Sequence, residues 1–519
     1  MKNFFLLITI IIIGFVSYYR ENIMKYYNKE ILGIEIKEID ESTSTGIVEK
    51  EKNKEIKNKK IDKKKAKSKI DTLRKRYALR GLIISGDLHF ENSRLALALQ
   101  KYLEAYKQNP NDELTIKKIG DTYFEMKKYD SAYKNFKSII NSNVLDKEKV
   151  LLSYLYSTEI NSNNIEEVLK EIDLFGFNEE ENFFYKNSIK CLSDYHVCKL
   201  DFGNYFTNFP DIKSEKLIGV KKAIKNYKDF KVDEVYYKNF LVLGELFKAK
   251  LYPISIKLGK DLLLEKEDYK NVIKIIGKSY FELGKYELAK EFFQKFYELD
   301  KKDSDVTYLL GVTHIKLHDY LLASINLKNT IELGYENPIN VKRRLIYAYY
   351  ELGETERMLK EFQNLVETEE PNLDIEDLSL AIYYHIINEK NLLAKKYAKL
   401  GIKLFPLEGI FYGYLGWMEK DAGNIEIAEK NLRKGLKLDR HNPLILLNLG
   451  QIELKKGNPV KSIIYFKKTI KIDKGQVFGE NAKKWLEKAN KIILEEKKAK
   501  EKEKTIIKEN KNSDNEING

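Results

Sequence analysis

The sequence predicts an all-α protein in which helical hairpins of about 34 residues stack into an α-solenoid behind an N-terminal membrane anchor. Three observations lead to this prediction. An apolar run opens the chain, glycines and alanines recur at a fixed interval along most of it, and the apolar residues within each interval have helical spacing.

The apolar run Phe4–Val16 contains one polar residue. The stretch Phe4–Tyr19 would form a helix of about 24 Å, slightly shorter than a hydrocarbon core of about 30 Å. Tyr18, Tyr19 and Arg20 follow the run, where a cleaved signal peptide needs small residues. We therefore predict an uncleaved signal-anchor helix over residues 1–20, through which the chain contacts a membrane.

The orientation of this anchor is ambiguous. Arg20, Lys25, Lys29 and Lys37 outnumber Lys2, which by the positive-inside rule would keep the body in the cytoplasm. A short N-tail carrying Lys2 ahead of an apolar core is nevertheless typical of an export signal. Of the two orientations we favour an extracytoplasmic body.

A basic linker follows over residues 21–76. Its second part, residues 50–76, holds fourteen Lys and Arg against four acidic residues. Most of the net charge of +13 therefore lies in this segment, and the body is close to neutral. A solvated spacer explains such a run, and attraction to an anionic surface of lipid or nucleic acid is the alternative.

The body shows an internal repeat. Two residue types keep an interval of 34 residues in three separate regions, which composition alone does not produce. The pairs are Gly86 and Gly120, Gly277 and Gly311, Gly416 and Gly450, Ala98 and Ala132, Ala289 and Ala323, and Ala394 and Ala428.

One copy, residues 271–303, shows what the repeat encodes. Ile273, Gly277 and Tyr280 lie on one face of a predicted helix, which Gly284 ends. A second apolar face follows, formed by Tyr286, Ala289, Phe292, Phe293 and Phe296. A hairpin of this kind cannot bury both faces alone, so it must stack on neighbouring copies.

These copies resemble the tetratricopeptide repeat. The family's order of large apolar, Gly, aromatic, Ala and aromatic residues is matched at Ile273, Gly277, Tyr280, Ala289 and Phe293. Copies begin near residues 79, 113, 236, 270, 304, 339, 375, 409 and 443, which places two repeats in 77–146 and seven in 236–476. Residues 147–235 are predicted to be irregular or degenerate helical repeats. Met358 stands where Ala is expected, so we predict a wider hairpin in the copy from 339.

The repeats are followed by a predicted capping helix over residues 477–497. Trp485, Leu486, Ala489, Ile492 and Ile493 form its apolar face. A terminal helix with one apolar and one charged face is what closes a repeat array. Residues 498–519 are rich in Lys, Glu and Asn, and we predict either a disordered tail or a frayed helix there.

No catalytic motif, cofactor-binding motif or metal site is predicted. The chain lacks a Gly-rich phosphate loop, a G-x-S-x-G motif and an HExxH motif. His314 and His318 lie at i and i+4 without a third ligand. Cys191 and Cys198 could pair across a turn, but buried free thiols are the state we favour. We therefore expect no enzyme activity.

The resemblance implies a binding role. In this family the first helix of each hairpin lines a concave groove that holds other proteins or extended peptides. A basic patch that runs into an aromatic one suits an extended peptide with an acidic group near one end. The predicted groove residues are Lys274, Lys278, Phe281, Tyr308, Arg343, Tyr347, Tyr350, Tyr383 and Trp417.

Other functions remain open. Helical-repeat proteins also bind single-stranded RNA, although the near-neutral body makes nucleic acid unfavourable here. A regulatory subunit of an enzyme complex would have the same architecture, and self-association is a further alternative. We favour a membrane-tethered scaffold for protein–protein interaction, with Trp417 as its main binding residue because Trp is enriched in hot spots.

Overall fold

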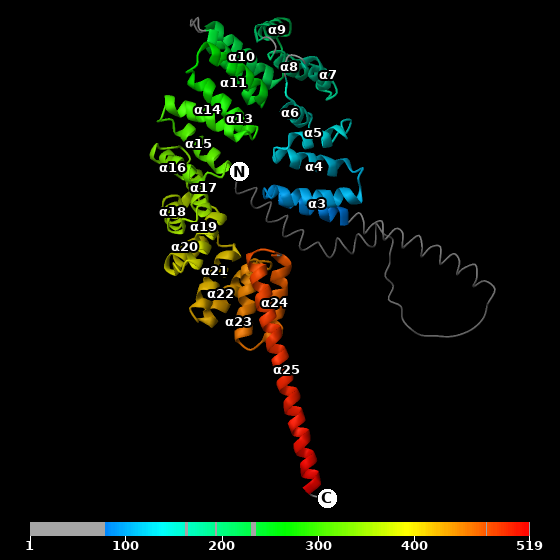
Figure 1. The fold of residues 1–519 in the computed structure, drawn as a ribbon, viewed down its shortest axis with the longest axis vertical. Coiled ribbons are helices and arrows are strands. Elements are labelled where there is room, and N and C mark those ends of the chain that lie inside the picture. Colours follow the sequence, from blue (N-terminus) through cyan, green and yellow to red (C-terminus); the bar gives the residue numbers. More distant parts are fainter. Residues whose placement is uncertain (1–77, 161–163, 193–194, 230–234, 474, 518–519) are drawn as a thin grey trace, which may run out of the picture. The chain divides into compact units, whose positions relative to one another are not determined.

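The computed structural model describes residues 78–160, 164–192, 195–229, 235–473 and 475–517 (Figure 1). All regular structure in these residues is helical, and none of them forms a strand. The predicted membrane anchor Phe4–Tyr19 and the basic linker 21–76 lie outside them. No helix in the described part of the chain combines the length and the apolar character needed to cross a bilayer.

The chain from Leu82 onward forms one compact unit. Its first helix, residues 78–91, pairs with α3 (Leu95–Gln108), and α4 (Glu113–Glu125) pairs with α5 (Tyr129–Lys137). The next helices are α6 (Lys147–Ser157), α7 (Ile165–Asp173), α8 (Glu179–Lys190), α9 (Tyr195–Asn208) and α10 (Glu215–Asp229).

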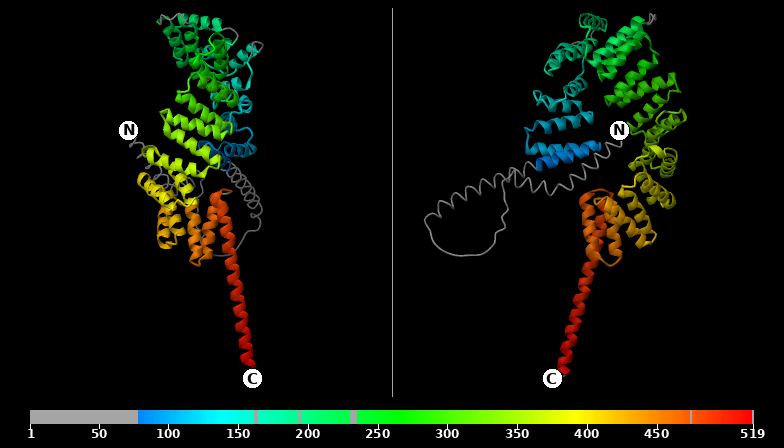
Figure 2. Two further views of the ribbon diagram at one scale, coloured as in Figure 1. Left: turned by 60° about the vertical axis from the view of Figure 1, so that its left-hand side comes forward. Right: turned by 180° about the vertical axis from the view of Figure 1, so that it is seen from behind.

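Hairpins then follow one another to the C-terminal region, and Figures 1 and 2 show their helices side by side in chain order. The pairs are α11 (Val235–Lys248) with α12 (Tyr252–Glu265), α13 (Lys270–Glu282) with α14 (Tyr286–Leu299), α15 (Ser304–Lys316) with α16 (Tyr320–Glu332), α17 (Pro338–Glu351) with α18 (Thr355–Thr368), α19 (Ile375–Ile387) with α20 (Asn391–Leu404), α21 (Gly409–Asp421) with α22 (Ile425–Leu438), and α23 (Pro443–Lys455) with α24 (Pro459–Ile472). The first helix of each pair begins within one residue of a copy start expected from the sequence.

The small residues of the repeat lie where two helices of a hairpin meet. A side-chain carbon added at Gly277 would lie 2.6 Å from the ring of Phe293, because α13 and α14 approach closely at this point. Ala289 is fully buried on the facing helix. The turn between the helices needs a left-handed residue, and Gly284 adopts it with φ of 77°. The repeat pattern therefore encodes contact within each hairpin.

The irregular interval is helical but does not continue the regular stacking. Instead, α5, α6 and the turn before α5 contact α12, α13 and the turn before α12, which lie more than 90 residues further along the chain. Lys127 donates from Nζ to the carbonyl oxygen of Phe281 (2.8 Å), and Tyr129 donates to that of Glu282 (3.1 Å). Tyr156 stacks on Tyr252 with ring centroids 5.6 Å apart. The copies before and after the interval are thus joined directly.

The expectation of free thiols in this interval is wrong. Cys191 is disulfide-bonded and 5% exposed. It follows the last residue of α8, where the chain turns toward α9. The sequence contains one other cysteine, Cys198, seven residues further along. A covalent link therefore constrains a part of the chain where the repeat pattern is lost.

The C-terminal segment is helical as far as Ile517. A single helix, α25 (Val477–Ile517), covers the expected cap and most of the expected tail, for which a frayed helix was one of the two alternatives. Figure 2 shows it extending well past the last hairpin. Lys498 with Glu501 and Lys500 with Glu503 place opposite charges three residues apart past the cap, a spacing that stabilises a helix.

Buried histidines make the stability of the fold pH-dependent. His385 is 1% exposed, and its Nδ1 donates to the carbonyl oxygen of Ala381 (2.7 Å). Burial lowers the pKa of His385, and also that of His314. The unfolded chain therefore takes up protons first as the pH falls below about 6.5, which weakens folding.

We expect the melting temperature to decrease between pH 7.5 and pH 5, and to decrease less in a His385→Tyr variant. Tyrosine fits because Tyr280 occupies the equivalent position of another copy. The melting temperatures of the wild type and of the variant at each pH are measured by thermal unfolding followed by circular dichroism. His441→Gln, a change at an exposed histidine, is the control and should keep the wild-type pH dependence. Equal pH profiles for all three proteins would show that His385 does not contribute.

Candidate functional site

The predicted basic patch at the start of the groove is neutralised within the protein. Lys274 in α13 forms ion pairs with Asp303 (3.2 Å) and Asp305 (2.8 Å), and Lys278 pairs with Asp305 (2.9 Å). These interactions hold Asp305 as the anion, so that its pKa is lowered despite its burial. The carboxylates come from the first turn of the next copy and its N-cap. The expectation of a patch that attracts an acidic group is therefore wrong for these two lysines.

Phe281 is covered by another part of the chain. The ammonium of Lys127 lies 5.5 Å from the centroid of its ring, and Tyr286 packs edge-on against it at 5.3 Å. Burial lowers the pKa of Lys127 in this contact. The direct joining of α5 and α6 to α12 and α13 thus occupies the face that the sequence analysis assigned to a ligand.

Tyr308 and Arg343 are also engaged. Tyr308 stacks on Tyr335 at 4.7 Å and accepts a hydrogen bond from Arg344 Nε (2.8 Å). Arg343 donates through Nε and Nη2 to Asp377 (2.8 and 2.6 Å), a bidentate pair. A further bond joins Nη2 to Asp374 (2.9 Å). Its charge is therefore compensated by the copy that follows.

We expected Trp417 to face solvent, but the structure places it in a packed position. It is half-buried, and its ring lies 6.1 Å from that of Tyr383. Phe478, at the start of α25, packs edge-on against the other side of this pair, 6.3 Å from Tyr383. Asp473 fixes the position by accepting hydrogen bonds from the backbone of Phe478 and the next residue (both 2.9 Å).

This packing changes what a substitution of Trp417 would report. Removing a half-buried indole leaves a cavity, so Trp417→Ala would lower stability as well as any binding. We therefore replace the expectation of a truncation without a structural effect by this one. Tyr383 and Trp417 thus belong to the packing between the C-terminal helix α25 and the repeats.

The remaining two predicted residues are open to solvent. Tyr347 and Tyr350 in α17 are 42% and 52% exposed. They border a pocket of about 250 Å³ among α17, α18 and α19, which we call the central pocket. It is lined by Arg343, Ile346, Tyr347 and Tyr350 from α17, by Met358, Phe362 and Leu365 from α18, and by Asp377, Leu380 and Tyr384 from α19.

The sequence analysis missed much of this lining. Phe362 and Leu365 of α18, and Leu380 and Tyr384 of α19, were not among the predicted groove residues. Burial raises the pKa of Tyr384 to about 12, so its hydroxyl is neutral at physiological pH. The one sequence feature that pointed to this pocket was Met358, which stands where the repeat has Ala and for which we predicted a wider hairpin.

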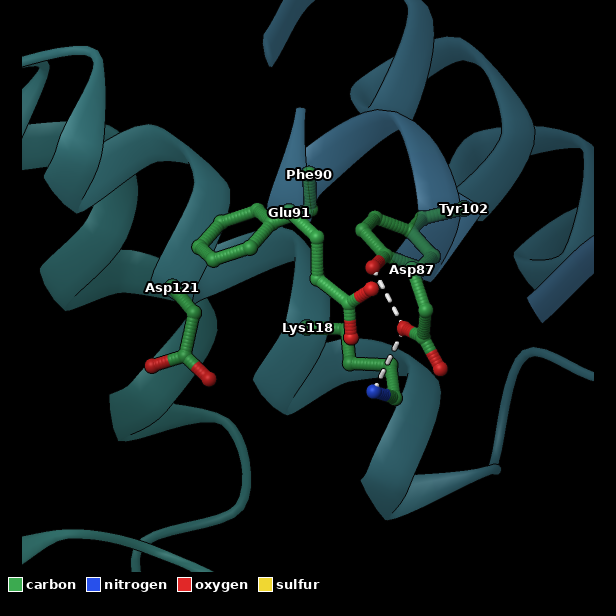
Figure 3. A pocket seen from close by; sticks show the side chains of 6 residues that line it. All are labelled: Asp87, Phe90, Glu91, Tyr102, Lys118 and Asp121. Atoms are coloured by element: carbon green, nitrogen blue, oxygen red, sulfur yellow. Dashed lines mark hydrogen bonds and ion pairs between the residues drawn. The ribbon is translucent and has the colours of Figure 1, made fainter. Parts of the chain in front are cut away.

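A second pocket, of about 190 Å³, lies between the first two hairpins. Figure 3 shows Asp87 between two donors, the hydroxyl of Tyr102 (2.6 Å) and the ammonium of Lys118 (2.6 Å). Glu91 and Asp121 also line it. Within the residues that the structure describes, no cluster of three or more His, Cys, Asp or Glu side chains could hold a metal ion. These bonds connect neighbouring copies, and we assign the pocket no ligand.

Comparison with known proteins identifies the repeats. Family models described as tetratricopeptide repeat match residues 275–303 and 415–477. A TPR repeat-containing protein of Methanocaldococcus jannaschii is 23% identical over 414 residues, which are 75% of this chain. The chain spans 63% of the length of that relative.

Two solved structures are also similar to this chain. The C-terminal part of a TPR repeat-containing protein from Cytophaga hutchinsonii is 15% identical and aligns over 47% of this chain and 98% of its own, with a TM-score of 0.38. Yeast Tom70 is 17% identical and aligns over 80% of this chain and 96% of its own, with a TM-score of 0.29.

Proposed function

Because the chain is a tetratricopeptide-repeat protein, we propose that it is a non-catalytic scaffold that binds another protein through the surface around Tyr347 and Tyr350. The observation that supports this most directly is the exposure of these two tyrosines beside an apolar pocket. Exposed aromatic side chains next to a pocket are typical of binding hot spots, since they bury a large area at small entropic cost.

The proposal places the binding surface in the centre of the predicted groove rather than along all of it. Lys274 and Lys278 are ion-paired, Phe281 is covered by Lys127, and Trp417 is packed against Tyr383. Phosphate groups need accessible cations, and here the cations already have carboxylate partners. These contacts favour a protein partner over RNA.

Membrane tethering is a further part of the proposal, based on the apolar run Phe4–Val16. The anchor would hold the repeats at a membrane surface, with the basic linker 21–76 between them, and we retain the extracytoplasmic orientation. Recovery of the full chain in the soluble fraction after cell lysis would contradict this part of the proposal.

We expect Tyr350→Ala to reduce the yield of cross-linked partner proteins at least about tenfold, since truncation of a hot-spot residue costs roughly 2 kcal/mol or more. The measurement is a quantitative cross-linking pull-down with the full chain from membranes. Tyr350 is half exposed, so its truncation should leave the melting temperature unchanged.

Tyr106→Ala is the matched control, because Tyr106 is an exposed tyrosine of α3 outside the proposed surface. It should capture the same proteins as the wild type. Equal capture by the Tyr350→Ala protein would show that the partner binds elsewhere. An absence of specific partners with all three proteins would contradict the scaffold role itself.

A further inference from the structure

We propose that the central pocket accepts one bulky apolar side chain, aromatic or leucine-like, from a partner segment in which Lys or Arg flanks that side chain. This inference rests on the proposed function and specifies the chemistry of the partner. It is carried by three features of the pocket: how it is formed, how large it is, and which charges surround it.

The pocket exists because one copy departs from the repeat at both close-contact positions. Ile346 occupies the position of Gly277 and Gly311 in the two preceding copies, and Met358 occupies the position of Ala289. Larger residues at both positions prevent the helix backbones from approaching as in the other hairpins. In agreement, α17 and α18 pack less closely than α13 and α14 or α15 and α16, and about as closely as α19 and α20, whose copy also carries an isoleucine, Ile382, at the glycine position.

The connection to the next copy widens the gap. Six residues, 369–374, separate α18 from α19, whereas four residues, 300–303, separate α14 from α15. The longer connection contains the short 3-10 helix η2 (Glu370–Asn372). Side chains bridge α17 and α19, as Arg343 and Asp377 do, whereas α21 and α23 pack closely, and residues of α18 line the pocket between α17 and α19.

The size of the pocket selects the kind of occupant. Its volume of about 250 Å³ lies below the range of about 300–1,000 Å³ in which drug-sized ligands bind. Ile346, Phe362 and Leu365 make its interior apolar, and Met358 adds an adaptable side chain. A single large apolar side chain therefore fits better than a metabolite or cofactor.

The charges at the mouth select what flanks that side chain. Arg343 is the one cation of the lining, and two carboxylates, Asp374 and Asp377, already bind it. Glu351 lies beside the hydroxyl of Tyr347 as a third carboxylate. Asp377 lines the pocket, whereas Asp374 and Glu351 lie at its rim, so one guanidinium stands against three carboxylates there. This excess of negative charge at the rim favours Lys or Arg in the partner and disfavours an acidic segment.

The test uses a phage-displayed library of random peptides, selected on the immobilised full chain. We expect the selected sequences to converge on one aromatic or leucine-like residue flanked by Lys or Arg. The tightest peptide is then synthesised with a fluorescent label, and its affinity is measured by fluorescence anisotropy against the wild type and two variants.

The variants are Leu380→Arg and Ile387→Arg, both in α19. Leu380 lines the pocket and is 41% exposed, whereas Ile387 is 48% exposed and does not line it. Both changes are at exposed positions, so both proteins should keep the wild-type circular dichroism spectrum and melting temperature. We expect Leu380→Arg to weaken peptide binding at least about tenfold and Ile387→Arg to leave it unchanged.

The other outcomes contradict specific steps. Selected peptides without the apolar and basic pattern, or peptides that bind the Leu380→Arg protein as tightly as the wild type, would overturn the pocket assignment and leave the scaffold role intact. A selection that yields no peptide, together with an absence of partners in the pull-down, would overturn both.

Discussion

Lys342→Met is expected to lower the free energy of unfolding by about 3–5 kcal/mol, because it leaves Glu369 as a buried charge without a partner. Lys342 and Glu369 are 5% and 9% exposed, and their charged groups lie 2.8 Å apart. The pair joins α17 to the end of α18, and Lys342 also contacts the hydroxyl of Thr368. Lys342 stands where other copies have a large apolar residue, such as Ile273.

Chemical denaturation followed by circular dichroism measures the effect. The double variant Lys342→Met with Glu369→Leu should recover most of the stability, since an apolar pair can replace a buried ion pair. Lys403→Met is the matched control, because Lys403 pairs with Glu370 at the surface, where an ion pair contributes about 0–1 kcal/mol. Equal effects of the two single changes would show that Lys342 is not buried in solution.

Gly435→Ala is expected to cost about 1–3 kcal/mol through overpacking. A side-chain carbon at Gly435 would lie 2.7 Å from the carbonyl oxygen of Gly409, and one at Gly409 would lie 2.5 Å from that of Gly435. Backbone atoms form this contact between α21 and α22, so no side chain can move aside to relieve it. The effect should exceed that at Gly416, where the nearest obstacle is the side chain of Leu432.

Gly244→Ala separates this steric effect from helix propensity. Gly244 lies within α11, and no atom lies within 4 Å of the position of an added side-chain carbon. Alanine should therefore stabilise the protein there, by up to about 1 kcal/mol. The melting temperatures of the two variants should change in opposite directions. A rise in both would show that α21 and α22 do not pack as closely as described.

Much of the fold could be predicted from the sequence, because the repeat encodes contacts within one hairpin. Gly277 and Ala289 identify the closest approach of two helices that adjoin in the chain, so residue type and spacing carry the information. Met358 predicts a wider hairpin for the same reason. The helix starts at 270, 304 and 375 follow from this local pattern.

The candidate site was predicted only in part. The repeat phase placed Tyr347 and Tyr350 on the exposed face of their helix, where the structure has them. It could not show that Leu380 and Tyr384 from another copy would line a pocket beside them. That lining comes from two copies, and the connection between them, two residues longer than the one between α14 and α15, contains no repeat position that predicts it.

The repeat pattern by itself determined the class of fold, the hairpin unit and its phase along most of the chain. Only the tertiary structure decided which groove positions stay open. Lys274 meets Asp305 of the next copy, Phe281 is covered by Lys127 from 154 residues earlier, and Tyr383 is packed against Phe478 of the last helix. A repeat specifies which way a side chain points, because that depends on its own helix. Whether the space in front of the side chain is free depends on residues elsewhere in the chain, which the repeat pattern does not relate to one another.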